Sequence, residues 1–283
     1  FNSPGTFTVT AGGEVELMVV GGGGGGSGGF PGFGPGQGGG GGGMAVATQY
    51  SVDSSPGSYP ITIGEPGIAG LRGPGSPPYN HLAGISGGDS VFTNPSSPLT
   101  VTGKGGGGAG GGENSGSGPM APYGTSRPGG SGGGGGWLQG GSAPQVAGGP
   151  ASQPTQNPGI SNLTNYGNAG GAGLNDTSGA GGTGGGGGGA GNTYPNVTGG
   201  AAQPNDYATG SAIAYAGGGL AGQPNPNVDG VQGSGAGGQG WGNVDCPSPS
   251  GGQEDGFGTE RGGYGGSGTV VVRYSIGASA GTA

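Results

Sequence analysis

Six short segments of the chain alternate between apolar and polar residues, which is the pattern of a β-strand with one buried face. In segment 14–20 the alternation places Val15, Leu17 and Val19 on one face. No segment repeats with a period of 3.6 residues, so we expect almost no α-helix. The predicted strands are rich in β-branched or aromatic residues and are bounded by Gly, Pro or Ser; they are 6–10, 14–20, 59–64, 90–92, 99–102 and 269–276.

The distribution of these strands predicts a sandwich closed by both ends of the chain. Five of them precede residue 103 and the sixth lies near the C-terminus, whereas 103–268 consists mostly of Gly, Ala, Ser, Asn and Pro. The middle must therefore leave the sandwich and return to it. Two similar tripeptides, 203–205 and 223–225, are predicted to be turns. The predicted units are a β-sandwich of 1–102 with 268–277 interrupted by glycine-rich loops at 21–58, an insert at 103–267, and a tail at 278–283.

The composition requires an unusual source of order. Of the 283 residues, 91 are Gly and 24 are Pro, and only 37 are Leu, Ile, Val or Phe. So few apolar side chains cannot offset the entropy lost when glycine is ordered. Backbone groups must be paired when buried, and the three-residue-per-turn extended helix points them outward to neighbouring helices. We therefore predict an all-β protein with an insert of packed polyglycine II helices.

Composition and charge also exclude several classes of protein. Five basic against thirteen acidic residues give a net charge of −8, which argues against binding nucleic acid or anionic membranes. No apolar stretch approaches the length of a membrane span. Glycine occurs in blocks such as 21–26 and 184–189 rather than at every third residue, so collagen is excluded. A single cysteine, Cys246, excludes an intramolecular disulfide framework.

Four motifs in order resemble the glycine-rich domain found in bacteriophage tail and tail-fibre proteins. The chain departs from that pattern at Thr10, which stands where the family usually has Pro, and in its unusually long middle insert. The four matching motifs are 7–9 with 15–26, 59–64, 89–92 followed by 99–108, and 265–274.

The resemblance implies an appendage protein with a TNF-like or jelly-roll-like β-module, sometimes joined to bundles of polyglycine helices. Some phage adhesins carry such bundles at fibre tips, and their distal loops touch the host receptor. Similar modules also occur in certain animal receptor ectodomains, so the resemblance does not fix the host.

Candidate catalytic and metal-binding residues are scarce. Three G-x-S-x-G matches, at 25–29, 84–88 and 129–133, are expected by chance in a chain so rich in Gly, and they lack a strand–turn–helix context. His81 is the only histidine, and Lys104 lacks the Ser or Thr of a phosphate-binding loop. The carboxylates show no calcium-loop spacing. We therefore predict no catalytic residues, no metal site and no cofactor.

Aromatic residues are the most informative side chains of the insert. Tyr and Trp form rigid, amphipathic contact surfaces at low entropic cost. Tyr123, Tyr166 and Tyr194 have the sequence context of loops, whereas the glycines around the two tryptophans also suit caps on the ends of the helices. The candidates for receptor contact are Tyr123, Tyr166, Tyr194, Trp137 and Trp241.

The function expected from these features is that of a non-enzymatic virion appendage that displays loops to a host surface protein or glycan. Its partners would be other virion subunits and copies of itself, as a trimer or larger assembly, in a virion or outside the cell. The main alternative is a purely structural fibre, sheath or filament subunit. An ice-binding protein would need regularly spaced Thr, and an enzyme would need clustered ionisable groups; the sequence has neither.

Overall fold

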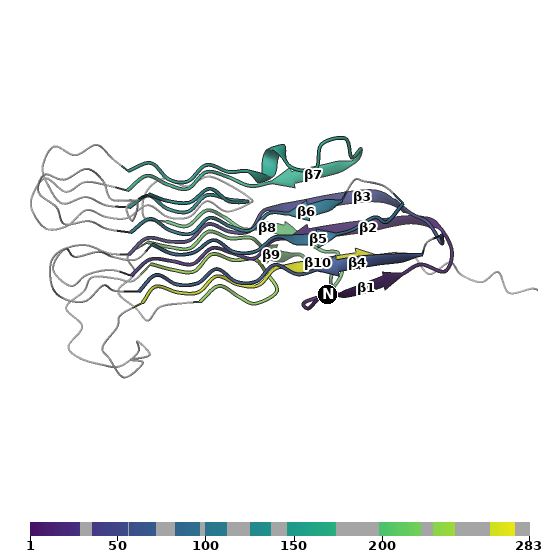
Figure 1. Ribbon diagram of the computed structural model, residues 1–283, viewed down its shortest axis with the longest axis horizontal. Coiled ribbons are helices and arrows are strands. Elements are labelled where there is room, and N and C mark those ends of the chain that lie inside the picture. The colour runs from purple at the N-terminus through teal and green to yellow at the C-terminus, as the bar shows by residue number, and fades with distance from the viewer. Residues whose placement is uncertain are drawn as a thin grey trace, which may run out of the picture.

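A computed structural model describes residues 1–28, 36–55, 57–71, 83–96, 100–111, 125–136, 146–173, 198–221, 229–240 and 261–274. The molecule is elongated, with its strands at one end and long parallel stretches of glycine-rich chain at the other (Figure 1). Its only described helix is a single 3₁₀ turn, η1 (Gln153–Thr155). The all-β prediction is confirmed.

Two four-stranded antiparallel sheets form the sandwich, and a two-stranded hairpin lies beside them. The first sheet has the order β1 (Gly5–Thr8), β4 (Ser58–Thr62), β5 (Ser90–Phe92) and β6 (Val101–Gly103). The second sheet has the order β10 (Thr269–Arg273), β2 (Gly13–Val20), β3 (Met44–Val52) and β7 (Leu163–Tyr166). The hairpin pairs β8 (Gln203–Asn205) with β9 (Ile213–Tyr215).

The main hydrophobic core lies between the two sheets. Val15, Leu17 and Val19 of β2 all point into it, as their alternation predicts. Phe92 of β5 is fully buried there and stacks on Tyr59 with ring centroids 5.4 Å apart. The strand pattern of the sequence therefore identified the residues that hold the sheets together.

The β8–β9 hairpin covers part of the outer face of the second sheet. A smaller apolar cluster joins Met18, Val20 and Met44 of that sheet to Tyr215 of β9. The prediction of a turn at 203–205 is wrong, because these residues form strand β8. A two-stranded hairpin exposes the outer edge of each strand, and Pro204 is tolerated there because it need not donate to a ladder. The similar tripeptide 223–225 lies outside the described residues.

Two strands of the second sheet were not predicted. β3 escapes detection because its inward residues include small alanines and because a bulge shifts the alternation within the strand. β7 lies inside the stretch expected to be insert, yet it pairs with β3 from Met44↔Tyr166 to Ala47↔Leu163. The middle of the chain thus supplies an edge strand as well as glycine-rich segments.

A buried network of hydrogen bonds from amide side chains joins β6, at the edge of the first sheet, to β7, at the edge of the second sheet. The Asn157 side chain accepts a hydrogen bond from the Thr102 N–H at 2.8 Å and donates to the Thr102 carbonyl at 3.0 Å. Gln153, also fully buried, donates to the same carbonyl and to Asn165 of β7. These bonds satisfy the backbone N–H and C=O groups of Thr102 at the edge of the first sheet. Without them, this edge could pair with a strand of another chain.

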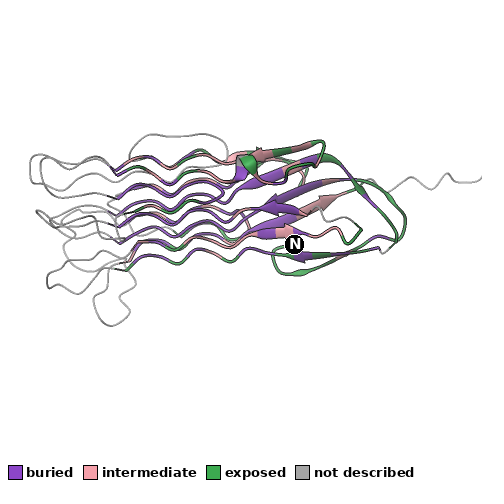
Figure 2. Ribbon diagram, turned by 45° about the horizontal axis from the view of Figure 1, so that its top comes forward, coloured by how far each residue is buried: buried purple, intermediate pink, exposed green. Residues whose placement is uncertain are grey.

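Most strands continue without interruption into a glycine-rich run. Residues 21–28 follow β2, 64–71 follow β4, and 261–268 lead into β10. Figure 2 shows that the runs in the centre of this array are buried throughout. We call these segments the glycine-rich runs; they are 21–28, 36–43, 64–71, 83–89, 104–111, 125–136, 146–150, 167–173, 198–202, 216–221, 229–240 and 261–268.

Hydrogen bonds between the glycine-rich runs repeat every three residues. In the central run 21–28, Gly21, Gly24 and Ser27 all donate their N–H groups to run 36–43. Gly22 and Gly25 donate to run 83–89, and Gly23 and Gly26 donate to run 261–268, all at 2.8–2.9 Å. A helix with three residues per turn produces this repeat. The polyglycine II form is defined by its backbone dihedral angles and stays a prediction.

Glycine is required in the central runs by close packing of backbones. An ideal Cβ on Gly24 would lie 2.1 Å from the Gly107 carbonyl oxygen, and one on Gly25 would lie 2.0 Å from the Ile68 oxygen. At the surface only one residue in three needs to be glycine. In run 64–71, Gly67 and Gly70 donate inward to run 21–28, whereas Ile68 is 52% exposed.

Candidate functional site

Four of the five predicted receptor-contact residues, Tyr123, Trp137, Tyr194 and Trp241, lie outside the described residues. The fifth, Tyr166, ends strand β7 and packs against the smaller apolar cluster on the second sheet. Its expected placement in a loop is wrong, because it belongs to strand β7, which lies with the other strands of the sandwich (Figure 1). Its role as a receptor contact stays a prediction. His81 and Cys246 also lie outside the described residues.

The other four aromatic residues share one feature of the sequence: each lies between two glycine-rich runs. The glycine-rich runs end on the side of the array away from the strands, which we call the distal end (Figure 1). Each of the four belongs to a segment that joins one run to another there, and the two tryptophans directly follow the last described residue of a run. The connecting segments are 29–35, 72–82, 112–124, 137–145, 174–197, 222–228 and 241–260.

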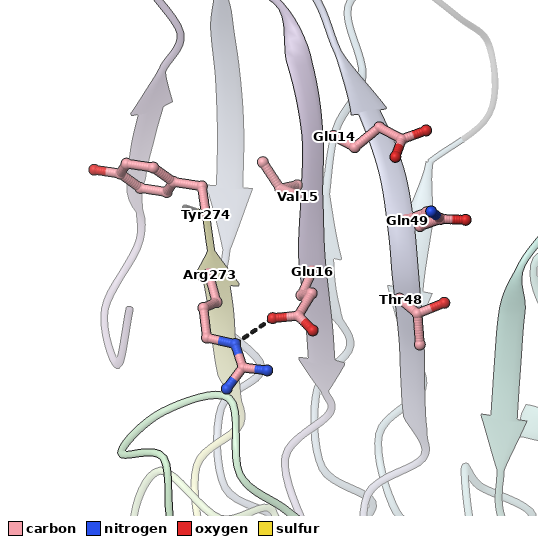
Figure 3. Close-up of a pocket in the computed structure, with 7 residues that line it drawn as sticks. All are labelled: Glu14, Val15, Glu16, Thr48, Gln49, Arg273 and Tyr274. Carbon is pink, nitrogen blue, oxygen red and sulfur yellow. Dashed lines mark hydrogen bonds and ion pairs between the residues drawn. The ribbon is translucent and has the colours of Figure 1, made fainter. Parts of the chain in front are cut away.

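A polar hollow lies on the outer face of the second sheet, at the opposite end of the molecule from the distal end. We call it the sheet hollow; its volume is about 520 Å³ (Figure 3). It begins beyond the part of the sheet that the β8–β9 hairpin covers, where the outward residues change from apolar to polar. Its lining comes from three strands and comprises Glu14, Val15, Glu16, Thr48, Gln49, Arg273 and Tyr274.

Arg273 is the fixed positive charge of the sheet hollow. Its Nε donates to the Glu16 carboxylate on the neighbouring strand, and its Nη1 lies 3.7 Å from Asp206 (Figure 3). The guanidinium carbon lies 4.8 Å from the centre of the Tyr207 ring, a cation–π distance. The register Arg273↔Glu16 creates the pair, and the segment after β8 adds the other two groups.

The ion pair changes the titration of both partners. The hydrogen bond from Arg273 is the largest cause that lowers the pKa of Glu16, and the same bond raises the pKa of Arg273. Glu16 is therefore a carboxylate near neutral pH and would be a poor general acid there. The group is suited to accepting hydrogen bonds rather than to donating a proton.

The ion pair makes stability depend on pH. Because the folded pKa of Glu16 is lowered, its contribution is present above the ordinary value of 4.5 and is lost as the pH falls through the folded pKa. The pair is partly exposed, so the effect is small. We expect Glu16→Gln to lower the Tm by about one to three degrees at pH 7, and this difference to disappear near pH 2–3.

Thermal unfolding followed by circular dichroism at several pH values measures this dependence. Glu14→Gln is the matched control, because Glu14 faces the same hollow and forms no ion pair within the described part of the chain. A Glu16→Gln variant whose Tm deficit is the same at pH 7 and pH 3 would show that the ion pair contributes nothing.

Sequence analysis missed the sheet hollow. The sequence does place Glu14 and Glu16 on the outward face of one predicted strand and Arg273 on another predicted strand. Only the pairing of these two strands brings the charged residues together. Within the described residues, no group of three or more His, Cys, Asp or Glu could hold a metal ion, and no helix is long and apolar enough to cross a membrane. Lys104, considered for phosphate binding, instead pairs with Asp89 at 2.7 Å.

Comparison with known proteins identifies a family. The model of a family described as a glycine-rich domain matches residues 2–275, nearly the whole chain. No curated protein matches the sequence.

Proposed function

The chain belongs to the glycine-rich domain family, and we propose that it is a virion appendage of the tail-fibre or adhesin type. In this proposal it displays loops rigidly for recognition of a host cell surface and catalyses no reaction. It would reside in a virion or outside the cell, with other virion subunits as partners. It would assemble as a trimer or a larger homo-oligomer and would neither bind nucleic acid nor enter a membrane.

The arrangement of the glycine-rich runs is the observation that carries this proposal. Backbone groups bond one run to the next, so the array does not depend on the side chains of the segments that connect the runs. Those segments can then change in sequence without disturbing the packing, which is what a recognition surface on a rigid scaffold requires. The described ends of the runs that these segments connect lie at the distal end, away from the sandwich (Figure 1).

Aromatic residues in the connecting segments support the same function. Tyr123, Trp137, Tyr194 and Trp241 all belong to these segments. Tyrosine and tryptophan are enriched in binding surfaces because they offer large rigid contacts with a polar tip. A receptor protein or a surface glycan is a suitable ligand for such residues.

Binding of the fluorescently labelled protein to a panel of bacterial strains, measured by flow cytometry, tests this function. Tyr123→Ala and Tyr194→Ala are expected to reduce binding to a recognised strain about tenfold or more, the loss typical of a central aromatic contact. The matched control is Tyr264→Ala, because Tyr264 is exposed on the side of run 261–268. The proposal would be contradicted if Tyr123→Ala and Tyr194→Ala bound as tightly as the wild type. It would also be contradicted if the wild-type protein bound none of the strains.

The outer runs argue against the alternative of a filament built on one continuous glycine lattice. Pro66 has no N–H to donate to a neighbouring chain, and the exposed Ile68 side chain occupies space that an added run would need. Ile85 on the next run has the same effect, with 43% of its surface exposed. Such residues end the lattice on this side, as charged or proline residues protect the edge of a sheet.

A further inference from the structure

We propose that the sheet hollow is a binding site for a neutral hexose unit of a saccharide, separate from the receptor contacts proposed for the connecting segments. The hollow and the distal end lie at opposite ends of the molecule, so this site would act in addition to the proposed loop recognition (Figures 1 and 3). Its volume of about 520 Å³ falls within the range of small-molecule sites.

A β-bulge gives the sheet hollow its polar wall. Val15 pairs with Tyr50, and Leu17 pairs with Ala47, so that Thr48 and Gln49 together oppose the single residue Glu16. In a regular strand one of two successive side chains would point into the core. Here both are exposed beside Glu16. Bulges of this kind often redirect side chains next to functional sites.

The hydrogen-bonding groups of the hollow suit a polyhydroxylated ligand. Glu14 and Glu16 offer carboxylate acceptors, whereas the Thr48 hydroxyl and the Gln49 amide both donate and accept. A sugar hydroxyl can also do both, so it can bond to any of these groups. Apolar atoms of the lining residues also face this space, and they suit the C–H groups of a sugar ring.

Arg273 supplies fixed donors to the same space. Its guanidinium has five N–H groups, and its position is held by Glu16, Asp206 and the Tyr207 ring. A group already held in place loses little freedom when a ligand binds. The ring of Tyr274, 58% exposed, points away from Arg273 toward Phe7, so we assign it no stacking role (Figure 3).

The charges of the hollow determine which saccharides it accepts. Glu14, Glu16 and Asp206 outnumber the single positive charge of Arg273. An anionic sugar such as a uronic acid would be repelled by these carboxylates, and its own carboxylate would compete with Glu16 for a guanidinium that is already paired. The site therefore favours uncharged hexoses over acidic ones.

Chemical-shift titration of the ¹⁵N-labelled protein with maltose and lactose, and with glucuronic acid for comparison, tests this site. We expect saturable shifts of the Glu16, Thr48 and Gln49 amides with a neutral disaccharide, and none with glucuronic acid. Gln49→Ala and Thr48→Val should each weaken binding about three- to tenfold, the effect of one lost hydrogen bond. Glu65→Gln, at an exposed carboxylate on run 64–71, is the matched control.

Three results would overturn the proposal: no saturable shift with either disaccharide up to about 50 mM, tighter binding of glucuronic acid, or unchanged binding by folded Gln49→Ala and Thr48→Val variants. Tyr123→Ala should leave the shifts intact. Failure of this site would leave host binding by the distal end untouched, so the two proposals can be judged separately.

Discussion

Replacing Gly25 with alanine is expected to prevent the chain from folding to its native state. The new Cβ would lie 2.0 Å from the oxygen and 2.4 Å from the carbon of the Ile68 carbonyl group. These are backbone atoms, and the Ile68 oxygen also accepts a hydrogen bond from Ile85 at 2.8 Å. Neither run can move away without breaking bonds to its other neighbours. We expect a loss of more than about 4–5 kcal/mol, measured by urea unfolding or as absence of folded protein.

Gly13→Ala is the matched control for this substitution. An added Cβ at Gly13, the first residue of β2, meets no atom within 4 Å. Its stability should lie within about 0.5 kcal/mol of the wild type. A Gly25→Ala protein that unfolds at the wild-type urea concentration would mean that the runs do not pack as closely as described.

Replacing Phe92 with alanine should destabilise the whole molecule by about 3–5 kcal/mol. Its side chain is fully buried, stacked on Tyr59 and edge-on to Tyr50 at 5.6 Å. Strand β5, which contains Phe92, directly continues run 83–89. We therefore expect sandwich and runs to unfold in one transition at a lower urea concentration, measured by circular dichroism and by glycine amide signals in parallel.

Phe92→Leu separates loss of aromatic packing from loss of volume. Leucine keeps most of the apolar burial, so the expected cost is smaller, about 1–2 kcal/mol. If the glycine amide signals of Phe92→Ala persist after the strand signal is lost, the runs are stable without the sandwich and the expected coupling is absent.

Local alternation predicted most of the sandwich because apolar residues are rare in this chain. Val15, Leu17 and Val19 are conspicuous in such a sequence, and each lies in the core. The strands that escaped prediction lack this contrast. β3 contains small inward residues and a bulge, and β7 is a four-residue edge strand. β8 contains a proline, and its partner β9 has only three residues.

The sequence could not predict which glycine-rich run lies beside which. Run 21–28 is bonded to runs from widely separated parts of the chain, including 83–89 and 261–268. Consecutive glycines carry no side-chain pattern that distinguishes one neighbour from another. The strands supply much of that information, because most runs adjoin a strand whose pairing is fixed by side chains. The sheet hollow escaped prediction for the same reason, since register and a bulge create it.

Amide hydrogen exchange measured by NMR tests most directly whether peptide groups hold this molecule together. The Gly24 N–H donates to the Gly40 carbonyl at 2.8 Å, and the Gly39 N–H donates to the Gly238 carbonyl at 2.9 Å. We predict that both amides exchange only on global unfolding, more than about a thousandfold slower than in an unfolded chain. The Ile68 amide, which donates to no described residue, should exchange quickly. Fast exchange at Gly24 and Gly39 in the folded protein would contradict the account.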